Sequence, residues 1–460
     1  MIKFKHKDPD IDPNNPFVNC KLKRKIYGEM LCDLVKNSED GFVLAINNEW
    51  GTGKTTFVKM WQALLEKEGF KTLYFNAWEC DYENDVFLAL LSEFKKIEEI
   101  KKDKDNLYST VIKHSVPVVK RVSVIAVKNI VDKFFGKGFT QEVLDSMTEI
   151  TADSIEKELQ ARTQQRQDIE TFKHSLHDFV AFNCNEKPLV FIVDELDRCR
   201  PDYAVNVLEQ IKHLFSIPNI VFVLSIDKKQ LGHAICGFYG SEHINAEEYL
   251  RRFIDIEYSL PEPHVAFYKY LIEYYDLNRF FNGNNELRDF HSFIEALFYL
   301  KRITLRQQER ILSHAGLCLS SFGYDFKIPG VLVFLIYLRQ FYLEFYNSLK
   351  NCTITYQDIV NETEKIIQDS QFRKTNGDIL LMTAYLLILY EKSNIYNGKP
   401  DNLLFNSDGK GNLTSVNIVS NIKTNPTLEE TLFTVYDNSD YYNFSLEYLT
   451  SKIDLYERFK

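Results

Sequence analysis

The sequence lacks three features that would each assign it to a common class of protein. Its eight cysteines are scattered over 460 residues without a Cys-x-x-Cys pair, so neither a zinc site nor a disulfide framework is indicated, and reduced thiols in a cytoplasm are expected. No apolar run follows the basic residues near the amino terminus, so no secretory signal is predicted. The net charge of -10 argues against a generic polyanion-binding protein, because such binding depends on an excess of positive charge.

Long hydrophobic runs are also missing. Residues 331–338 and 379–390 fall short of the ~18–20 apolar residues that a membrane-spanning helix needs, and charged residues, Arg339 and Glu391, follow them directly. We therefore expect both runs to form buried helices. The 45% hydrophobic content, with 35 Phe and 26 Tyr, supports a large core, and the length accommodates two or three domains of ~100–200 residues each.

Apolar runs at five places indicate the strands of a parallel sheet. They are residues 41–47, 72–77, 189–193, 220–226 and, less strongly, 254–258. Helical patterns separate them, and continuous apolar runs are typical of strands buried on both faces. The predicted fold class is α/β, a doubly wound parallel sheet with a helical insertion and an α-helical C-terminal region. The sheet domain is expected from residues 1–83 and 188–260, the insertion at 84–187, the helical domain at 261–394 and a polar tail at 395–460.

A phosphate-binding loop is indicated between the first strand and the helix that follows it. Residues 48–55 (NEWGTGKT) match the P-loop (Walker A) pattern except at the first position, where Asn48 replaces glycine. We expect this replacement to be tolerated because asparagine is the usual second choice for left-handed backbone. In this pattern Lys54 reaches the β- and γ-phosphates, and Thr55 supplies a hydroxyl to magnesium. The alternative is a surface turn with an incidental lysine.

Acidic side chains follow two later strands. Asp194 and Glu195 end the third strand, as a Walker B pair would, with one carboxylate for hydrated magnesium and one to orient and deprotonate a water. Since the carboxyl ends of parallel strands face one crevice, this pair is expected to meet the phosphates held by the first loop. Asp227 follows the fourth strand and is a candidate sensor of the γ-phosphate. For all three acids, helix or turn capping is the alternative.

A further cation is expected to neutralise charge as the terminal phosphate departs. We favour Arg306, because it begins a helix introduced by Thr304, with Gln307 three residues further on as in a capping box. The other candidates are Arg198, Arg200, Arg251, Arg252 and Arg310.

Taken together, these segments resemble the KAP family of P-loop NTPases. The resemblance is carried by residues 47–56 (NNEWGTGKTT), 74–78 (YFNAW), 191–199 (FIVDELDRC), 222–227 (FVLSID) and 305–313 (LRQQERILS), and it covers roughly residues 10–320. It implies that the nucleotide contacts residues Trp50, Gly51, Thr52, Gly53, Lys54, Thr55, Thr56 and Asp227, that Thr55 and Asp194 hold magnesium, and that Glu195 activates water. The family usually shows Asp-Asp where this chain has Asp194-Glu195, and the change keeps a carboxylate.

The resemblance also raises questions of location and biological setting. Many members carry transmembrane hairpins, whereas lysines and arginines interrupt the corresponding region here. Residues 118–135 are then either a helix packed in a subdomain or a basic amphipathic helix on a membrane surface. The bacterial branch is similar to the plasmid-encoded phage-exclusion protein PifA, so the resemblance implies a role in antiviral defence.

The sequence therefore predicts a cytoplasmic ATPase with ATP and magnesium as cofactors, which switches conformation or assembly on hydrolysis. ATP is preferred over GTP because no guanine-reading Asn-Lys-x-Asp pattern occurs. A homo-oligomer or an effector protein is the expected partner. The alternatives are a nucleotide-binding scaffold with little turnover and an ATPase stimulated by nucleic acid, the latter disfavoured by the acidic net charge.

Overall fold

The computed structural model describes residues 7–38, 40–83, 85–101, 107–119, 155–185, 187–214, 217–241, 243–261, 267–281, 284–300, 303–322, 328–368, 376–396, 403–408, 413–437 and 445–457. The chain divides into two compact units. One is Pro9–Glu262, and the other is Pro263–Lys460 together with Met1–Asp8.

The first unit is built on a five-stranded parallel sheet. Its strands are β1 (Val43–Asn47), β2 (Thr72–Asn76), β3 (Leu189–Asp194), β4 (Ile220–Ile226) and β5 (Ile256–Tyr258), in the order β2-β3-β4-β1-β5. Every residue of β3 and β4 is buried, as continuous apolar runs require. The five strands predicted for the parallel sheet agree with the five observed in it in number and in order along the chain.

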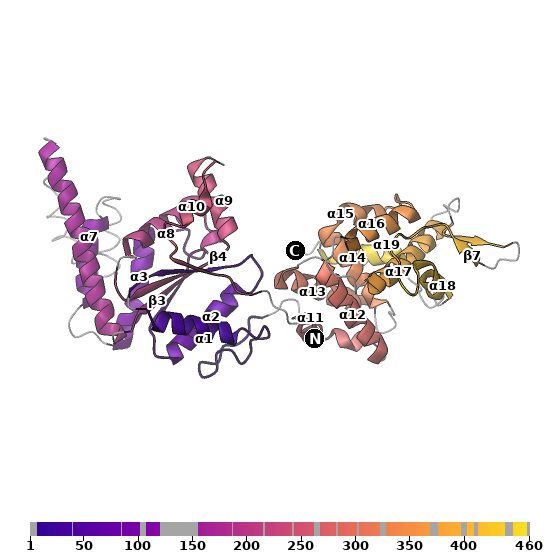
Figure 1. The fold of residues 1–460 in the computed structure, drawn as a ribbon, viewed down its shortest axis with the longest axis horizontal. Helices are drawn as coiled ribbons and strands as arrows, with labels where there is room; N and C mark the ends of the chain where they lie inside the picture. The colour runs from indigo at the N-terminus through magenta and orange to yellow at the C-terminus, as the bar shows by residue number, and fades with distance from the viewer. Residues whose placement is uncertain are drawn as a thin grey trace. The chain divides into compact units, whose positions relative to one another are not determined.

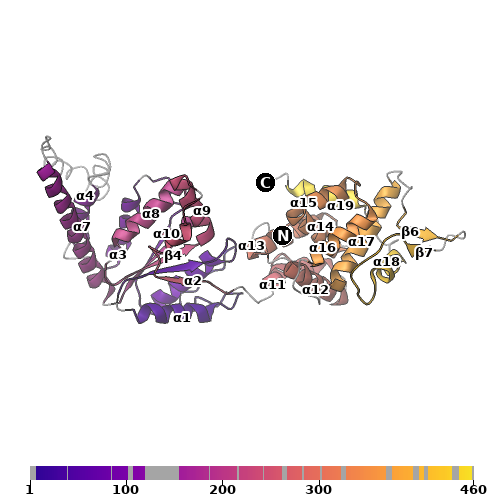
Figure 2. The same cartoon turned by 45° about the horizontal axis from the view of Figure 1, so that its top comes forward.

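Helices cover both faces of this sheet (Figures 1 and 2). Successive strand residues point to opposite faces, so Leu44 and Ile46 pack with α1 (Lys25–Lys36) and α2 (Lys54–Lys67), whereas Val43 and Ala45 pack with the helices of the other face. Those helices include α3 (Val86–Lys101), α8 (Pro201–Leu214), α9 (Lys228–Tyr239) and α10 (Ala246–Leu250). The result is a three-layer α/β/α unit.

The insertion between β2 and β3 is helical where the structure describes it. After α3 come α4 (Leu107–Val119) and α7 (Ile155–Cys184), which lie side by side, with the rings of Tyr108 and Phe179 5.7 Å apart (Figure 1). Residues 118–135, considered above as a membrane-surface helix, lie outside the described residues apart from their first two positions.

The second unit is mainly helical. Its helices are α11 (Phe267–Tyr274), α12 (Asn284–Leu300), α13 (Leu305–Phe322), α14 (Pro329–Phe341), α15 (Leu343–Lys350), α16 (Tyr356–Gln368), α17 (Asn376–Tyr396), α18 (Leu428–Asp437) and α19 (Leu446–Glu457). The two apolar runs fall on α14 and α17, where they are almost entirely buried, as expected. No described helix is both long enough and apolar enough to span a membrane.

The helix that carries the first apolar run, α14, ends at Phe341, and α15 begins at Leu343, with Tyr342 in a non-helical conformation between them. A later part of this unit differs from the sequence-based expectation. Residues 395–460 were expected to be a polar tail. They include a hairpin of β6 (Phe405–Ser407) and β7 (Leu413–Val416), and Leu432 of α18 and Leu449 of α19 are fully buried in the helical core. The finer domain boundaries within each unit stay predictions.

Candidate functional site

The register of the sheet brings the polar strand ends to one edge. Asn76 of β2 pairs with Asp194 of β3, Asp194 pairs with Ser225 of β4, and Asn47 of β1 pairs with Ile226. The loops that follow these strands therefore open at the same edge of the sheet, as expected for the carboxyl ends of parallel strands.

The loop after β1 has the backbone conformation of a phosphate cradle. Gly51 and Gly53 adopt positive φ angles of 80° and 82°, which a side chain would disfavour, and Gly53 is the N-cap of α2. The backbone N–H groups at the start of a helix have no partner within the helix, so they favour an anion there. Thr55 and Thr56 lie in the first turn of α2, both partly buried.

Asn48 departs from the glycine of the pattern for a different reason from the one expected. It is absent from the described residues with positive φ, so the explanation from left-handed backbone was wrong. Instead its side-chain amide bridges the main chain after β5, with Nδ2 donating to Leu260 O at 2.9 Å and Oδ1 accepting from Leu260 N at 2.8 Å. The residue ties the start of the loop to the edge of the sheet.

Lys54 begins α2, directly after the loop whose Trp50 contacts Asp197. Its side chain is buried, and its Nζ donates to the carbonyl oxygens of Asn48 and, at 3.2 Å, Glu49. Burial lowers the lysine pKa, while attraction from Asp197, Asp227 and Asp194 opposes that shift. The charges of three carboxylates from the segments after β3 and β4 therefore act on this lysine.

Asp194 is held at both oxygens. The hydroxyl of Tyr74 on β2 donates to Oδ2 at 2.8 Å, and the backbone N–H of Glu195 donates to Oδ1 at 2.9 Å. Burial, together with the neighbouring Asp194 charge, raises the pKa of Tyr74, so the phenol stays a donor. The residue predicted to hold magnesium therefore has a fixed carboxylate plane.

Glu195 adopts a strained backbone and has both carboxylate oxygens occupied. Its φ of 61° is left-handed, a conformation that costs a non-glycine residue on the order of 1–3 kcal/mol and is often found at functional sites. Arg198 pairs with Oε1 at 2.7 Å, and Asn76 Nδ2 donates to Oε2 at 3.3 Å. The Arg198 guanidinium also lies over the ring of Trp78, 5.4 Å from its centre. The carboxylate is oriented by Arg198 from its own segment and by Asn76 from β2.

Asp197 joins the P-loop to the segment after β3, a contact that was not predicted. This carboxylate is buried, and the indole Nε1 of Trp50 in the loop donates to it. Burial raises the pKa of Asp197, while the hydrogen bond from Trp50 and the charge of Lys54 act against the rise. Of the acids after β3, only Asp194 and Glu195 were predicted to have a role, and the one available signal for Asp197 was its place two residues further on in DELDR.

Asp227 and Arg306, the other predicted site residues, lie at helix amino ends. Asp227 is the N-cap of α9 and accepts from Gln230 N at 3.2 Å, which is the capping alternative, although its charge also acts on Lys54. Arg306 lies exposed on α13 in the second unit, where the predicted capping box is confirmed: Thr304 N donates to Gln307 Oε1 at 2.8 Å, and Gln307 N donates to Thr304 Oγ1 at 3.3 Å. Within the first unit, Arg198 forms an ion pair with Glu195.

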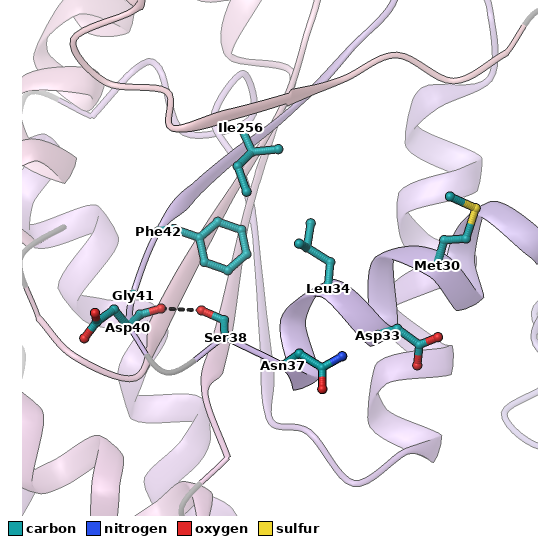
Figure 3. A pocket seen from close by; sticks show the side chains of 9 residues that line it. All are labelled: Met30, Asp33, Leu34, Asn37, Ser38, Asp40, Gly41, Phe42 and Ile256. Atoms are coloured by element: carbon teal, nitrogen blue, oxygen red, sulfur yellow. Dashed lines mark hydrogen bonds between the residues drawn. The ribbon is translucent and has the colours of Figure 1, made fainter.

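A separate pocket lies at the amino ends of the strands (Figure 3). Phe42 just before β1, Ile256 at the start of β5 and Leu34 of α1 line it, with the acid Asp33 at its rim. P-loops and Walker acids occupy the carboxyl ends of the strands, so this pocket belongs to the opposite edge of the sheet.

The site residues fit a nucleoside triphosphate with magnesium. A glycine cradle at a helix N-terminus, a buried lysine and a fixed carboxylate converge, which is the set of donors and acceptors that such a ligand needs. Fold and site together define a P-loop NTPase domain, and the predicted fold class is confirmed.

The sequence matches the KAP family P-loop domain over residues 24–312, more than half of the chain, and the protein belongs to this family. No curated protein gives a significant sequence match to it. Among solved structures, that of the Aeropyrum pernix ORC2 protein (ADPNP-ADP complexes) is similar at 13% sequence identity and a TM-score of 0.35, covering 94% of this chain and 97% of that chain. A likeness at this TM-score says nothing about function.

Proposed function

We propose that the protein binds and hydrolyses ATP with magnesium, and that the cycle switches its conformation or assembly. The observation that supports this most strongly is that the glycine cradle and its buried Lys54 open at the same edge of the sheet as Asp194 and Asp227, with Trp50 of the cradle bonded to Asp197. A structural lysine would be paired or solvated, whereas this one is buried and bonds only to carbonyl oxygens among the described residues. Such a lysine is arranged to receive an anion.

Each residue has a distinct task in the proposed reaction. Backbone N–H groups of residues 51–55 and the ammonium of Lys54 bind the β- and γ-phosphates. Thr55 and Asp194 would hold magnesium, which when bound neutralises phosphate charge. Glu195 accepts a proton from the attacking water at a carboxylate oxygen. Arg306 is retained as a candidate for neutralising transition-state charge, and Arg198 is the alternative within the first unit.

The contacts of Glu195 support a switch rather than a constantly active site. Arg198 and Asn76 occupy both of its oxygens, so accepting a proton from water requires these contacts to loosen. Nucleotide binding beside Lys54 changes the charge that Arg198 experiences and is a physical cause for such a rearrangement. A homo-oligomer or an effector protein would respond to it. A cytoplasmic setting belongs to this proposal through the scattered cysteines, and a role in antiphage defence belongs to it through the resemblance to PifA alone.

The test is to separate binding from turnover. Phosphate release and the affinity for a fluorescent ATP analogue are measured for the wild type, Lys54→Ala and Glu195→Gln. We expect Lys54→Ala to lose binding, and Glu195→Gln to keep affinity within about threefold while turnover falls about 100-fold or more. Glu429→Gln, an exposed glutamate on α18, is the matched control and should behave as wild type. Binding without measurable phosphate release in the wild type would leave only a nucleotide-binding scaffold, whereas equal turnover in wild type and Glu195→Gln would refute the role of Glu195.

A further inference from the structure

Arg24 is a buried cation directly behind the P-loop. It is the N-cap residue of α1 and only 2% exposed. Its Nη1 donates to Thr52 O at 2.9 Å and to Gly53 O at 3.3 Å. Its Nε and Nη2 are buried without a hydrogen-bond partner among the described residues.

No carboxylate compensates this charge in the part of the chain that is described. The ionisable groups that act on Arg24 are the thiol of Cys20 and the phenols of Tyr27 and Tyr258, all neutral at neutral pH, and burial lowers the arginine pKa. A buried cation without a counter-ion destabilises a folded protein, so its presence calls for an anion elsewhere.

The two carbonyl groups that Arg24 contacts indicate where that anion binds. In a trans peptide the C=O and the N–H point in opposite directions. The carbonyl of Thr52 shares its peptide with the N–H of Gly53, and the carbonyl of Gly53 shares its peptide with the N–H of Lys54. A guanidinium on those oxygens therefore turns both N–H groups toward the opposite side, the inside of the cradle, and polarises them.

We propose that Arg24 is a positioning residue that pre-orients the N–H groups of Gly53 and Lys54 for the phosphates of the nucleotide, without touching the nucleotide itself. This inference rests on the proposed function, because it names how the same site obtains its affinity. The ligand group it serves is the diphosphate moiety rather than the base or the ribose. The charge of Arg24 is offset when that polyanion binds on the far side of the two peptides.

The experiment compares Arg24→Met and Arg24→Lys with wild type, using inorganic pyrophosphate, ADP and ATP as ligands in calorimetry. We expect Arg24→Met to weaken all three by a similar factor of about 10, and Arg24→Lys, which keeps the charge but has no planar fork, to recover part of the loss. Lys25→Met removes an equal charge from an exposed neighbour that pairs with Glu29, and its affinities should stay within twofold.

Thermal unfolding without ligand separates positioning from a purely structural role. If Arg24 is a positioning residue, Arg24→Met without ligand should have a melting temperature at or above that of the wild type. Pyrophosphate should then raise the melting temperature of the variant by less than that of the wild type. A lower melting temperature with unchanged pyrophosphate affinity would overturn it and leave Arg24 as a strap between α1 and the loop. If Arg24→Met does not fold, Arg24→Lys carries the test, and wild-type affinity in that variant would also overturn the inference. Failure of the wild type to bind any of the three ligands would instead refute the proposed function and the inference with it.

Discussion

Replacing Asn48 with the glycine of the P-loop pattern should destabilise the first unit. The change removes both hydrogen bonds to the main chain of Leu260, which is itself buried. Each such bond contributes about 0.5–1.5 kcal/mol net, and the freer unfolded backbone of glycine adds about 0.4–1 kcal/mol. The expected loss is therefore about 1.5–4 kcal/mol for Asn48→Gly and about 1–3 kcal/mol for Asn48→Ala, which lacks the backbone contribution.

Urea unfolding followed by tryptophan fluorescence measures this change in the correct unit. The three tryptophans of the chain, Trp50, Trp61 and Trp78, all lie within Pro9–Glu262, so their emission does not report on the helical unit. The difference in free energy is taken from the shift of the midpoint at constant slope. Because the two units can unfold separately, the fluorescence signal must show a single two-state transition before a free energy of unfolding is assigned.

Asn219→Gly is the matched control for this prediction. Asn219 precedes β4 in the same unit and has a positive φ of 64°, where glycine is favoured, so this substitution should cost less than about 1 kcal/mol. The reasoning fails if Asn48→Gly unfolds at the wild-type urea concentration, or if the two glycine variants lose equal stability. The side-chain bridge would then contribute nothing, and the pattern's glycine would be acceptable at this position.

Two further predictions concern buried carboxylates. Glu391 on α17 accepts a hydrogen bond from Leu404 N, and burial raises its pKa from 4.5 to about 7. The contribution of its protonated form to the free energy of unfolding is therefore fully present below pH 4.5 and is lost as the pH rises to about 7. In urea unfolding followed by circular dichroism, Glu391→Gln should therefore have the same free energy of unfolding as wild type near pH 4.5. At pH 8 its free energy of unfolding should be about 2 kcal/mol higher, after allowance for solvent screening. Equal stability of the two proteins at both pH values contradicts this. Trp50→Phe removes the donor to the buried Asp197 and should cost about 1–3 kcal/mol in urea unfolding followed by circular dichroism, with weaker binding of ATP; unchanged midpoints would show that this contact is incidental.

The sequence was informative about the sheet where burial alone determines the pattern. β4 was predicted at its observed bounds, Ile220–Ile226, because every one of its residues is buried and the apolar run has no gap. β5 was expected from residue 254 but begins at Ile256, an edge strand whose first two residues are exposed. On an exposed edge the hydrophobic signal is weak, so the boundary shifts.

The segment predicted to be a polar tail was interpreted from its average composition and not from the spacing of its apolar residues. Residues 395–460 are rich in Asn, Asp and Ser, yet Leu428, Leu432 and Val435, and then Leu446, Leu449 and Ile453, recur at helical spacing and are buried. Three apolar residues per helix are enough to fasten a short helix to an existing core. The helical spacing of these apolar residues is present in the sequence, but the average composition of the segment does not show it.

The contacts that give the site its properties were beyond the sequence for a different reason. Residue types at motif positions predict Lys54, Asp194 and Glu195, since each motif is local in the chain. The partner of Asp194 is Tyr74, 120 residues away, and it lies there only because β2 is the neighbour of β3 in the sheet. Strand order follows from the packing of the whole unit and from no local pattern. Single motifs therefore predict the reacting groups of a P-loop site but not the residues that hold those groups in position. A departure from the motif such as Asn48 can be interpreted only after the partners of its side chain are known.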